Sequence, residues 1–250
     1  MAVKPSHSAA RVLSVLEQVA LRQPIGVSAL AKLLGEDKSA VQRAVVTLAD
    51  AGWIRVAPEP PTRWELTAHI FAVAHLPHSS DGLRQRARPI LEALRDRTGE
   101  TAFLAIPDSY RFVVIEAAES LHSLRMALRV GQTTPVRESA TGRALLPYFS
   151  PARQAAMLGE APDAALIAVF AETRARGYGL SVGEVLKGST NIAAPVFSDP
   201  ILGDDGEPVA AITVSGPSDR LTADRHAEVG ALVAQAAQGL SRRRSAQGGG

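Results

Sequence analysis

Residues 27–66 read VSALAKLLGEDKSAVQRAVVTLADAGWIRVAPEPPTRWEL, and their pattern decides the fold of the first part of this chain. Ser28 is of a residue type that caps helices, and leucines recur behind it at helical spacing as far as Leu34. Gly35 tolerates the left-handed conformation that ends a helix, and Asp37 is a suitable cap for a second helix. The stretch therefore predicts two short helices joined by a tight turn, which is a helix-turn-helix.

A hairpin is predicted directly after the second helix. Residues 53–56 (WIRV) and 63–66 (RWEL) have the aromatic and β-branched character of short strands. The segment between them contains Pro58, Pro60 and Pro61, which lack the N–H group that a strand ladder needs. Because the prolines favour a turn there, we expect a winged helix-turn-helix.

The exposed side chains of this unit suit DNA. The second helix has one apolar face and leaves its polar residues at the outward, N-terminal end. Arg and Gln can pair with the edges of guanine and adenine, while Lys and Ser reach phosphates with help from free N–H groups at the helix start. Arginines of the wing are expected to contact the phosphate backbone. The predicted DNA-binding residues are Ser28, Lys38, Ser39, Gln42, Arg43, Thr47, Arg55 and Arg63.

The composition sets bounds on the class of protein. A chain of 250 residues is long enough for two modest domains. It contains no Cys, which excludes disulfides and thiolate chemistry and agrees with a reducing cytoplasm. We expect neither a signal peptide nor a membrane span, since no basic segment precedes an apolar run and no long apolar run occurs. The net charge of +2 falls within residues 1–66, so DNA binding is expected to depend on local charge placement and on dimerisation.

The remainder of the chain predicts a connection and a second domain. Residues 67–82 are expected to hold a linker helix and a connection, and residues 83–97 a long amphipathic helix that contains Pro89. Strands are predicted at 102–106, 110–117, 124–128, 192–197 and 209–214, with helices at 142–149, 151–158, 166–176 and 222–240. The resulting fold class is α+β, with a DNA-binding domain at 1–66, a second domain at 83–241 and a disordered tail at 242–250.

The residues themselves resemble the IclR family of bacterial transcription regulators. The DNA-binding motif of that family is matched by LG at 34–35, KSAVQR at 38–43 and GWIR at 52–55. The second half follows the family's order and spacing at LRM (124–126), VG (130–131), ATGRALL (140–146), RGY (176–178), IAAPVF (192–197) and AAITVSGP (210–217). The resemblance implies a GAF-like domain with an antiparallel sheet and flanking helices, which binds a small effector. It also implies a homodimer or dimer of dimers that binds a double-stranded operator, with repression as the expected mode.

The resemblance also indicates where an effector would bind. In the family, effectors are held around the segment that matches 140–146 and on the strands that match 192–197 and 210–217. Carried over residue by residue, the expected effector site consists of Leu124, Met126, Ala140, Thr141, Ser181, Ser189, Asn191, Thr213 and Ser215. This chain departs from the family at Asn191, where Cys is frequent, and at Ser181, where an acidic residue is common. Hydroxyl and amide groups can bind a carboxylate, an aromatic alcohol or an amide, so the effector's identity stays open.

Two other functions compete with DNA-binding regulation. Residues 179–183 (GLSVG) match the pattern of a hydrolase nucleophile elbow, with Ser181 as the nucleophile. The charged segment 172–177 precedes it where an elbow needs a buried strand, so we expect no enzyme. The second alternative is a ligand-binding or protein-interaction module without specific DNA binding. Retention of specific DNA at physiological salt separates the regulator from both alternatives.

Metal binding is not expected. His69, His75 and His78 lie close in sequence, but Pro77 interrupts the helical spacing and no carboxylate stands at ligand distance. The GDDG segment at 203–206 is too short for a calcium loop and is predicted to be a hairpin turn. The sequence therefore predicts neither a metal nor another cofactor.

Overall fold

The computed structural model describes residues 6–74, 81–197 and 206–241, which form two compact units that divide after residue 78. Each unit has its own hydrophobic core. The predicted tail at 242–250, the GDDG turn except Gly206, and both His75 and His78 lie outside the described residues. Within the described ranges, no helix is long and apolar enough to cross a membrane.

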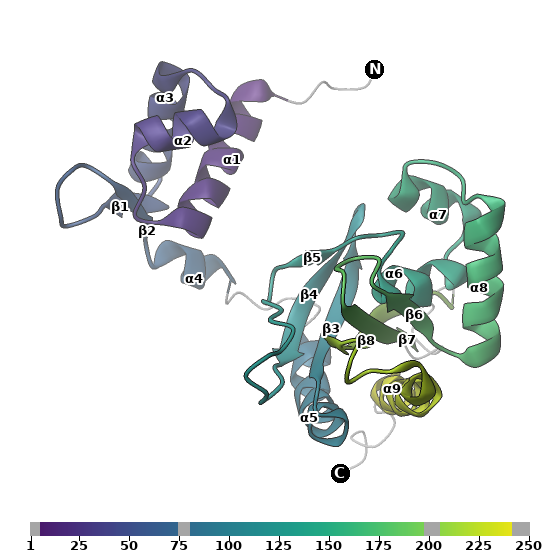
Figure 1. The fold of residues 1–250 in the computed structure, drawn as a ribbon. Helices are drawn as coiled ribbons and strands as arrows, with labels where there is room; N and C mark the ends of the chain where they lie inside the picture. Colours follow the sequence, from purple (N-terminus) through teal and green to yellow (C-terminus); the bar gives the residue numbers. More distant parts are fainter. Residues whose placement is uncertain (1–5, 75–80, 198–205, 242–250) are drawn as a thin grey trace, which may run out of the picture. The chain divides into compact units, whose positions relative to one another are not determined.

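The first unit is a winged helix-turn-helix, as predicted (Figure 1). Its elements are α1 (His7–Arg22), α2 (Val27–Leu34), α3 (Lys38–Asp50), β1 (Ile54–Val56), β2 (Trp64–Leu66) and α4 (His69–Ala74). Gly35 ends α2 in the left-handed conformation with φ of 63°, and the Asp37 side chain caps α3. The predicted cap at Ser28 is wrong, because α2 begins at Val27 and Gly26 occupies the cap position. Ser28 is an exposed residue of the first helical turn.

The hairpin forms where the sequence predicts it. Strands β1 and β2 are antiparallel, and Arg55 lies opposite Glu65. The Ala57 N–H donates to the Arg63 carbonyl at 2.8 Å, which closes the pairing at the start of the proline-rich turn. On the other side, Trp64 exchanges two backbone hydrogen bonds with Ile25. The hairpin is thereby attached to the segment between α1 and α2.

The second unit is built on one antiparallel sheet with the strand order β5-β4-β3-β8-β7-β6, which confirms the α+β class. The strands are β3 (Thr101–Asp108), β4 (Arg111–Ala118), β5 (Thr133–Thr134), β6 (Gly179–Val182), β7 (Ser189–Phe197) and β8 (Pro208–Pro217). The helices are α5 (Asp81–Thr98), α6 (Ala140–Leu145), α7 (Pro151–Leu158), α8 (Ala164–Arg176) and α9 (His226–Ser241), with short 3₁₀ helices at Leu146–Tyr148 and Ala223–Arg225.

Helices cover both faces of this sheet (Figure 1). Helices α5 and α9 pack on one face, where Ile192, Ala194 and Ile212 contribute to the main core. On the other face, α6 packs against Ala193 of β7. Because successive strand residues point to opposite faces, Asn191 shares the α6 face with Ala193. The alternation places a set of polar strand residues beneath α6.

One predicted strand of this unit does not form, and two short strands, β5 and β6, were not predicted. No strand forms at 124–128, and the edge of β4 pairs instead with Thr133–Thr134 of β5. The Val114 N–H donates to the Gln132 carbonyl, and the Val114 carbonyl accepts a hydrogen bond from the Gly131 N–H, so this edge of β4 is already occupied. The sequence reading also missed β6, a short edge strand that pairs with β7.

Candidate functional site

Helix α3 presents a polar face to solvent. Its exposed residues include Lys38, Ser39, Gln42, Arg43 and Thr47, whereas Val41, Ala44, Val45 and Leu48 are buried in the core of the unit. The buried face fixes α3 against α1 and α2. Five of the eight residues predicted to contact DNA thus lie together on one helix.

The start of α3 differs from the expectation of free N–H groups. The Asp37 carboxylate accepts hydrogen bonds from the N–H groups of Ser39, at 2.9 Å, and Ala40, at 3.2 Å, and from the Ser39 hydroxyl. The Ser39 side-chain hydrogen bond, followed by the two backbone hydrogen bonds, holds the pKa of Asp37 below its usual value. Because an ionised carboxylate already occupies these donors, the helix start is not open to phosphate in this structure.

Val46 also lies on the exposed face of α3 and was missed by the sequence analysis. It is 44% exposed and stands one turn after Arg43. The Arg43 guanidinium lies within 3.4 Å of the Ser39 hydroxyl, and the Thr47 hydroxyl donates to the Arg43 carbonyl at 2.9 Å. An apolar side chain in such a position can contact a thymine methyl group. The helical spacing of 39, 42, 43 and 46 was a signal that could have found it.

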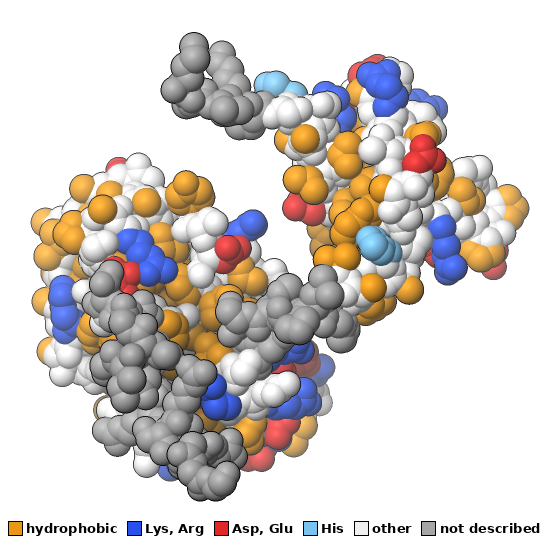
Figure 2. Space-filling view, turned by 180° about the vertical axis from the view of Figure 1, so that it is seen from behind, with side chains coloured by type: hydrophobic (Ala, Val, Ile, Leu, Met, Phe, Trp, Pro, Cys, Tyr) orange, Lys and Arg blue, Asp and Glu red, His pale blue; other side chains and the backbone are white. Residues whose placement is uncertain are grey.

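The two wing arginines have different surroundings. Arg55 forms an ion pair with Glu65 across the hairpin, with 2.8 Å between Nε and Oε1. Arg63 is exposed, and among the described residues it takes part in no ion pair. Figure 2 shows basic side chains on the helical part of this unit and beside its hairpin, without one continuous basic patch on the face seen. Arg63 therefore offers a full positive charge, whereas Glu65 offsets that of Arg55.

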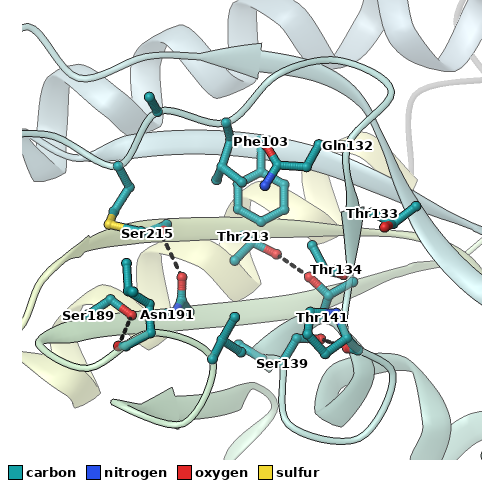
Figure 3. Close-up of a pocket in the computed structure, with 17 residues that line it drawn as sticks. Phe103, Gln132, Thr133, Thr134, Ser139, Thr141, Ser189, Asn191, Thr213 and Ser215 are labelled. Carbon is teal, nitrogen blue, oxygen red and sulfur yellow. Dashed lines mark hydrogen bonds between the residues drawn. The ribbon is translucent and has the colours of Figure 1, made fainter. Parts of the chain in front are cut away.

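The second unit contains a cavity of about 260 Å³ on the α6 face of the sheet (Figure 3). Its floor comes from β3, β7 and β8, and its walls come from the start of α6 and from three loops. The lining residues are Phe103, Met126, Ala127, Leu128, Gln132, Thr133, Thr134, Pro135, Ser139, Ala140, Thr141, Val185, Leu186, Ser189, Asn191, Thr213 and Ser215. None of these side chains is charged, so a ligand would be held by neutral polar groups and apolar contacts.

Hydrogen bonds orient the polar side chains of the cavity. The hydroxyls of Thr141 and Thr213 lie 3.1 Å apart, which joins α6 to β8. The Ser215 hydroxyl donates to Asn191 Oδ1 at 2.5 Å (Figure 3). Among the described residues the Asn191 amide nitrogen donates to no partner, which leaves its two N–H groups for a ligand. The Thr134 hydroxyl is buried and has no hydrogen-bond partner within the described part of the chain. The cavity thus contains unused hydrogen-bonding capacity.

The cavity brings together seven of the nine predicted effector residues: Met126, Ala140, Thr141, Ser189, Asn191, Thr213 and Ser215. Leu124 does not line it. This residue is 71% exposed, because the segment around it is not paired to the sheet. Ser181 also lies outside the lining, since it is buried on the edge strand β6, opposite Asn191. The sequence placed Leu124 and Ser181 in the effector site, but neither residue is part of the cavity wall.

Other lining residues were missed by the sequence analysis. Phe103 lies directly opposite Thr213 in the pairing of β3 with β8, so strand register was a signal that could have located it. Thr133 and Thr134 belong to a strand that the sequence reading did not predict. Ser139 caps α6 through a hydrogen bond from the Gly142 N–H to its hydroxyl, a local pattern that the sequence does display.

The geometry does not support a hydrolase at Ser181. This residue lies within β6, paired to β7, and not at a strand-to-helix turn. Its hydroxyl is buried and has no hydrogen-bond partner among the described residues. A nucleophile elbow needs an exposed hydroxyl beside a base.

For metals, the described residues contain no group of three or more His, Cys, Asp or Glu side chains that could hold an ion. His69 packs edge-on against Trp53, with 4.6 Å between ring centroids.

Comparisons with known proteins identify both units. The IclR helix-turn-helix domain matches residues 8–58, and the domain described as bacterial transcriptional regulator IclR C-terminal matches residues 76–242. The chain is 30% identical over 246 residues to the transcriptional repressor IclR of Escherichia coli K12, an alignment that covers 93% of this chain and 88% of that protein. It is 31% identical over 242 residues to the HTH-type transcriptional regulator BhcR of Paracoccus denitrificans, covering 92% and 85% of the two chains.

Solved structures share the fold. An IclR homolog from Microbacterium hydrocarbonoxydans, crystallised with 4-hydroxybenzoate, has a TM-score of 0.76 at 21% identity and covers 94% of this chain and 97% of its own. A putative IclR regulator from Silicibacter has a TM-score of 0.73 at 24% identity and covers 94% and 95% of the two chains. Together with the domain matches and the helix-turn-helix geometry, these findings show that the chain belongs to the IclR family of bacterial transcriptional regulators and is a DNA-binding regulator.

Proposed function

We propose that this protein is a transcriptional repressor whose affinity for its operator is changed by a small organic effector bound in the cavity of the second unit. The observation that carries the proposal is the cavity of about 260 Å³, with oriented polar groups and an apolar wall, in a chain that also has a helix-turn-helix. Pockets of this kind hold small molecules by burying an apolar body and orienting a polar end. The names of the related repressors support the sign of regulation.

In this proposal the DNA-binding domain spans residues 1–66, a connection spans 67–82 and the effector domain spans 83–241. Gln42 and Arg43 read base edges in the major groove, and Lys38 and Arg63 contact phosphates. The protein acts in the cytoplasm as a homodimer or a dimer of dimers. Dimerisation doubles the modest positive charge and places two recognition helices in successive major grooves.

The proposed effector has an apolar or aromatic body and one polar end. Phe103, Met126 and Leu128 supply the apolar contacts. The Asn191 amide nitrogen supplies hydrogen-bond donors at the polar end. Donors of this kind bind a carboxylate, a carbonyl or an amide oxygen, so the candidate class is a small carboxylate, phenol or amide metabolite.

Effector binding changes operator affinity only if the two DNA-binding states of the protein bind the effector unequally. The effector is therefore proposed to shift the population between two arrangements of the DNA-binding domains. The coupling works in both directions: operator DNA must change the affinity for the effector by the same factor as the effector changes the affinity for operator DNA.

The proposal is tested in two steps. Genomic fragments retained by the purified protein at physiological salt identify the operator, and thermal-shift screening of metabolites identifies compounds that stabilise the protein. A compound found in this way is then titrated into the protein–operator complex, followed by fluorescence anisotropy. Repression by effector release predicts a loss of anisotropy. Failure to retain specific DNA, or indifference of the complex to every stabilising compound, contradicts the proposal.

A further inference from the structure

One wall of the cavity is formed by Met126, Ala127 and Leu128, which lie in a segment, residues 124–128, that belongs to no strand. Met126, Ala127 and Leu128 line the cavity, yet Leu124 and Ala127 are exposed on the outside. The wall is therefore only one layer of residues thick. Since no sheet ladder holds this segment, other groups must keep it in place.

The Thr101 hydroxyl is the first of these groups. Thr101 begins β3 and is fully buried. Its hydroxyl accepts a hydrogen bond from the Ser120 N–H at 3.1 Å and donates one to the Met126 carbonyl at 2.7 Å. One side chain thus joins the start of the loop to the middle of the wall, although Thr101 itself does not line the cavity.

Arg220 holds the wall at a second point. Its guanidinium forms two hydrogen bonds with the carboxylate of Glu100, which is 1% exposed, and its Nη2 also donates to the Leu124 carbonyl at 3.0 Å. The space for this carboxylate depends on Gly216, since a Cβ there would lie 2.5 Å from Glu100 Oε2. A bidentate pair of this type fixes the guanidinium in orientation as well as position.

The two bonded carbonyls, of Leu124 and Met126, are two residues apart. In an antiparallel ladder, alternate residues bond to the same neighbouring strand. Here a side chain from the start of β3 and one from the turn after β8 take the place of that neighbour. These two side-chain hydrogen bonds therefore attach the backbone of the segment to the sheet, while Leu128 packs on the cluster of Phe103, Ala105 and Val114 and Arg125 forms an ion pair with Glu119.

We propose that Thr101 and the Arg220–Glu100 pair are positioning residues of the effector site, which hold the wall at 124–128 closed over the cavity. The inference rests on the proposed function only for the identity of the occupant. Loss of either attachment frees the wall to move outward and exposes the cavity to solvent. This clamp, formed by Thr101 and the Arg220–Glu100 pair, therefore controls access to the cavity and the shape of the cavity that an effector would bind.

The absence of cysteine in the natural sequence allows a direct test without knowledge of the effector. Ala140, which lines the cavity and is 1% exposed, is replaced by Cys, and the rate of its reaction with a water-soluble maleimide is measured in the full-length protein. We expect Thr101→Val, which keeps the shape and removes the hydroxyl, to raise this rate at least fivefold. Thr101→Ser keeps the hydroxyl and is expected to stay within twofold of the parent.

A second cysteine distinguishes wall opening from general loss of stability. Ala237 lies on the buried side of α9, in the core on the opposite face of the sheet, so Ala237→Cys reports opening of the unit as a whole. The proposal predicts no change at this position in Thr101→Val. An equal increase at both cysteines, an unchanged rate at Ala140→Cys, or failure of Thr101→Ser to restore the parent rate overturns it.

The Arg220 contact needs a variant that does not leave a buried carboxylate unpaired. The double variant Glu100→Gln with Arg220→Met removes both charges and the donor to Leu124. This double variant is also expected to raise the labelling rate at Ala140→Cys and to leave the rate at Ala237→Cys unchanged. An unchanged rate at Ala140→Cys, or an equal increase at both positions, contradicts the role of Arg220. These labelling results do not depend on operator binding, so failure of the clamp and failure of the proposed repressor function are seen in different measurements.

Discussion

Asn191 determines much of the cavity's hydrogen-bonding chemistry. Its carbonyl oxygen is occupied by the Ser215 hydroxyl, from the residue directly opposite on β8. The amide nitrogen is therefore left to bind an acceptor on a ligand.

Replacing Asn191 by Leu should raise the effector concentration needed for a response about tenfold and leave the free protein's operator affinity within about twofold. The change removes donors from the cavity and does not touch the DNA-binding unit. A lost hydrogen bond of about 1.5 kcal/mol corresponds to a tenfold weaker ligand. The measurement is release of labelled operator during titration with a compound found by thermal shift. Val182→Ala, on an exposed residue of β6 outside the lining, is the control, and a wild-type response from Asn191→Leu would place the effector elsewhere.

Arg43→Ala should cost about 1–3 kcal/mol on the operator and relax the preference at one base pair. The guanidinium lies on the exposed face of α3, where it can pair with guanine. Competition with operators substituted at single positions measures the effect. Arg43→Lys keeps the charge but loses the bidentate fork, so it should not restore base preference. Equal losses on operator and random DNA, restored by Lys, would instead make Arg43 a phosphate contact.

At the scale of elements, the recognition helix and the hairpin differ in which of their donors and charges are already bonded within the unit. Helix α3 is stabilised at its start by Asp37, which uses the donors that would otherwise attract an anion. The hairpin carries two arginines, of which one is paired to Glu65. The contribution of each polar or charged group to DNA binding therefore depends on the groups already bonded to it.

Arg63→Ala should weaken binding to all DNA sequences and reduce the slope of log affinity against log salt by about 0.9. Arg55→Ala should reduce that slope by less, because Glu65 already offsets its charge. Fluorescence anisotropy across a salt series measures both slopes. Glu65→Gln serves as the converse control, since it frees Arg55 and should steepen the slope. Equal slopes for all three variants and the parent would exclude wing contact with phosphates.

Asp37→Ala should lower the melting temperature of the helix-turn-helix unit near neutral pH, because the start of α3 loses its cap. The pKa of Asp37 is lowered in the folded state, chiefly by the Ser39 side-chain hydrogen bond. Its stabilisation is therefore present above the pKa of the unfolded chain and is lost as the pH falls through the folded pKa. Thermal unfolding by circular dichroism should show the difference between parent and variant shrinking in acid. Asp37→Asn can cap without titrating, and a pH dependence that persists in it would assign the effect to another group.

At the scale of the whole molecule, we propose that regulation uses an assembly with two recognition helices. The helix-turn-helix unit carries a modest net positive charge, and a single copy of α3 presents few readers. A two-fold symmetric assembly reads two half-sites and multiplies their separate preferences. In the proposed mechanism, the effector changes whether both half-sites can be occupied together.

The operator should therefore consist of two half-sites in phase on the DNA helix. Inserting about 5 base pairs between them should reduce affinity strongly, and inserting about 10 should restore a large part of it, because only the latter returns both sites to one face. Footprinting on the spaced operators provides the measurement. Equal affinity for all spacings, or full affinity for one half-site alone, would contradict a two-fold symmetric complex.

The sequence by itself determined the helix-turn-helix, since caps and turns depend on neighbouring residues. Gly35 and Asp37 act within a few residues of their own positions, and the prolines of the hairpin exclude a ladder locally. Strand alternation likewise located β3, β7 and β8, but it also predicted a strand at 124–128 that does not form. Whether an extended segment becomes a strand depends on a free edge beside it, and β5 occupies that edge of β4.

Only the tertiary structure decided which polar residues share the cavity. Thr141 and Thr213 are 72 residues apart, yet their hydroxyls meet, while Ser181 is buried beside the cavity without lining it. The side chains that hold the wall, Thr101 and Arg220, could not be recognised from any motif. Which residues meet in the cavity depends on the register between strands that are distant in sequence and on side-chain hydrogen bonds. Neither can be read from the pattern of neighbouring residues.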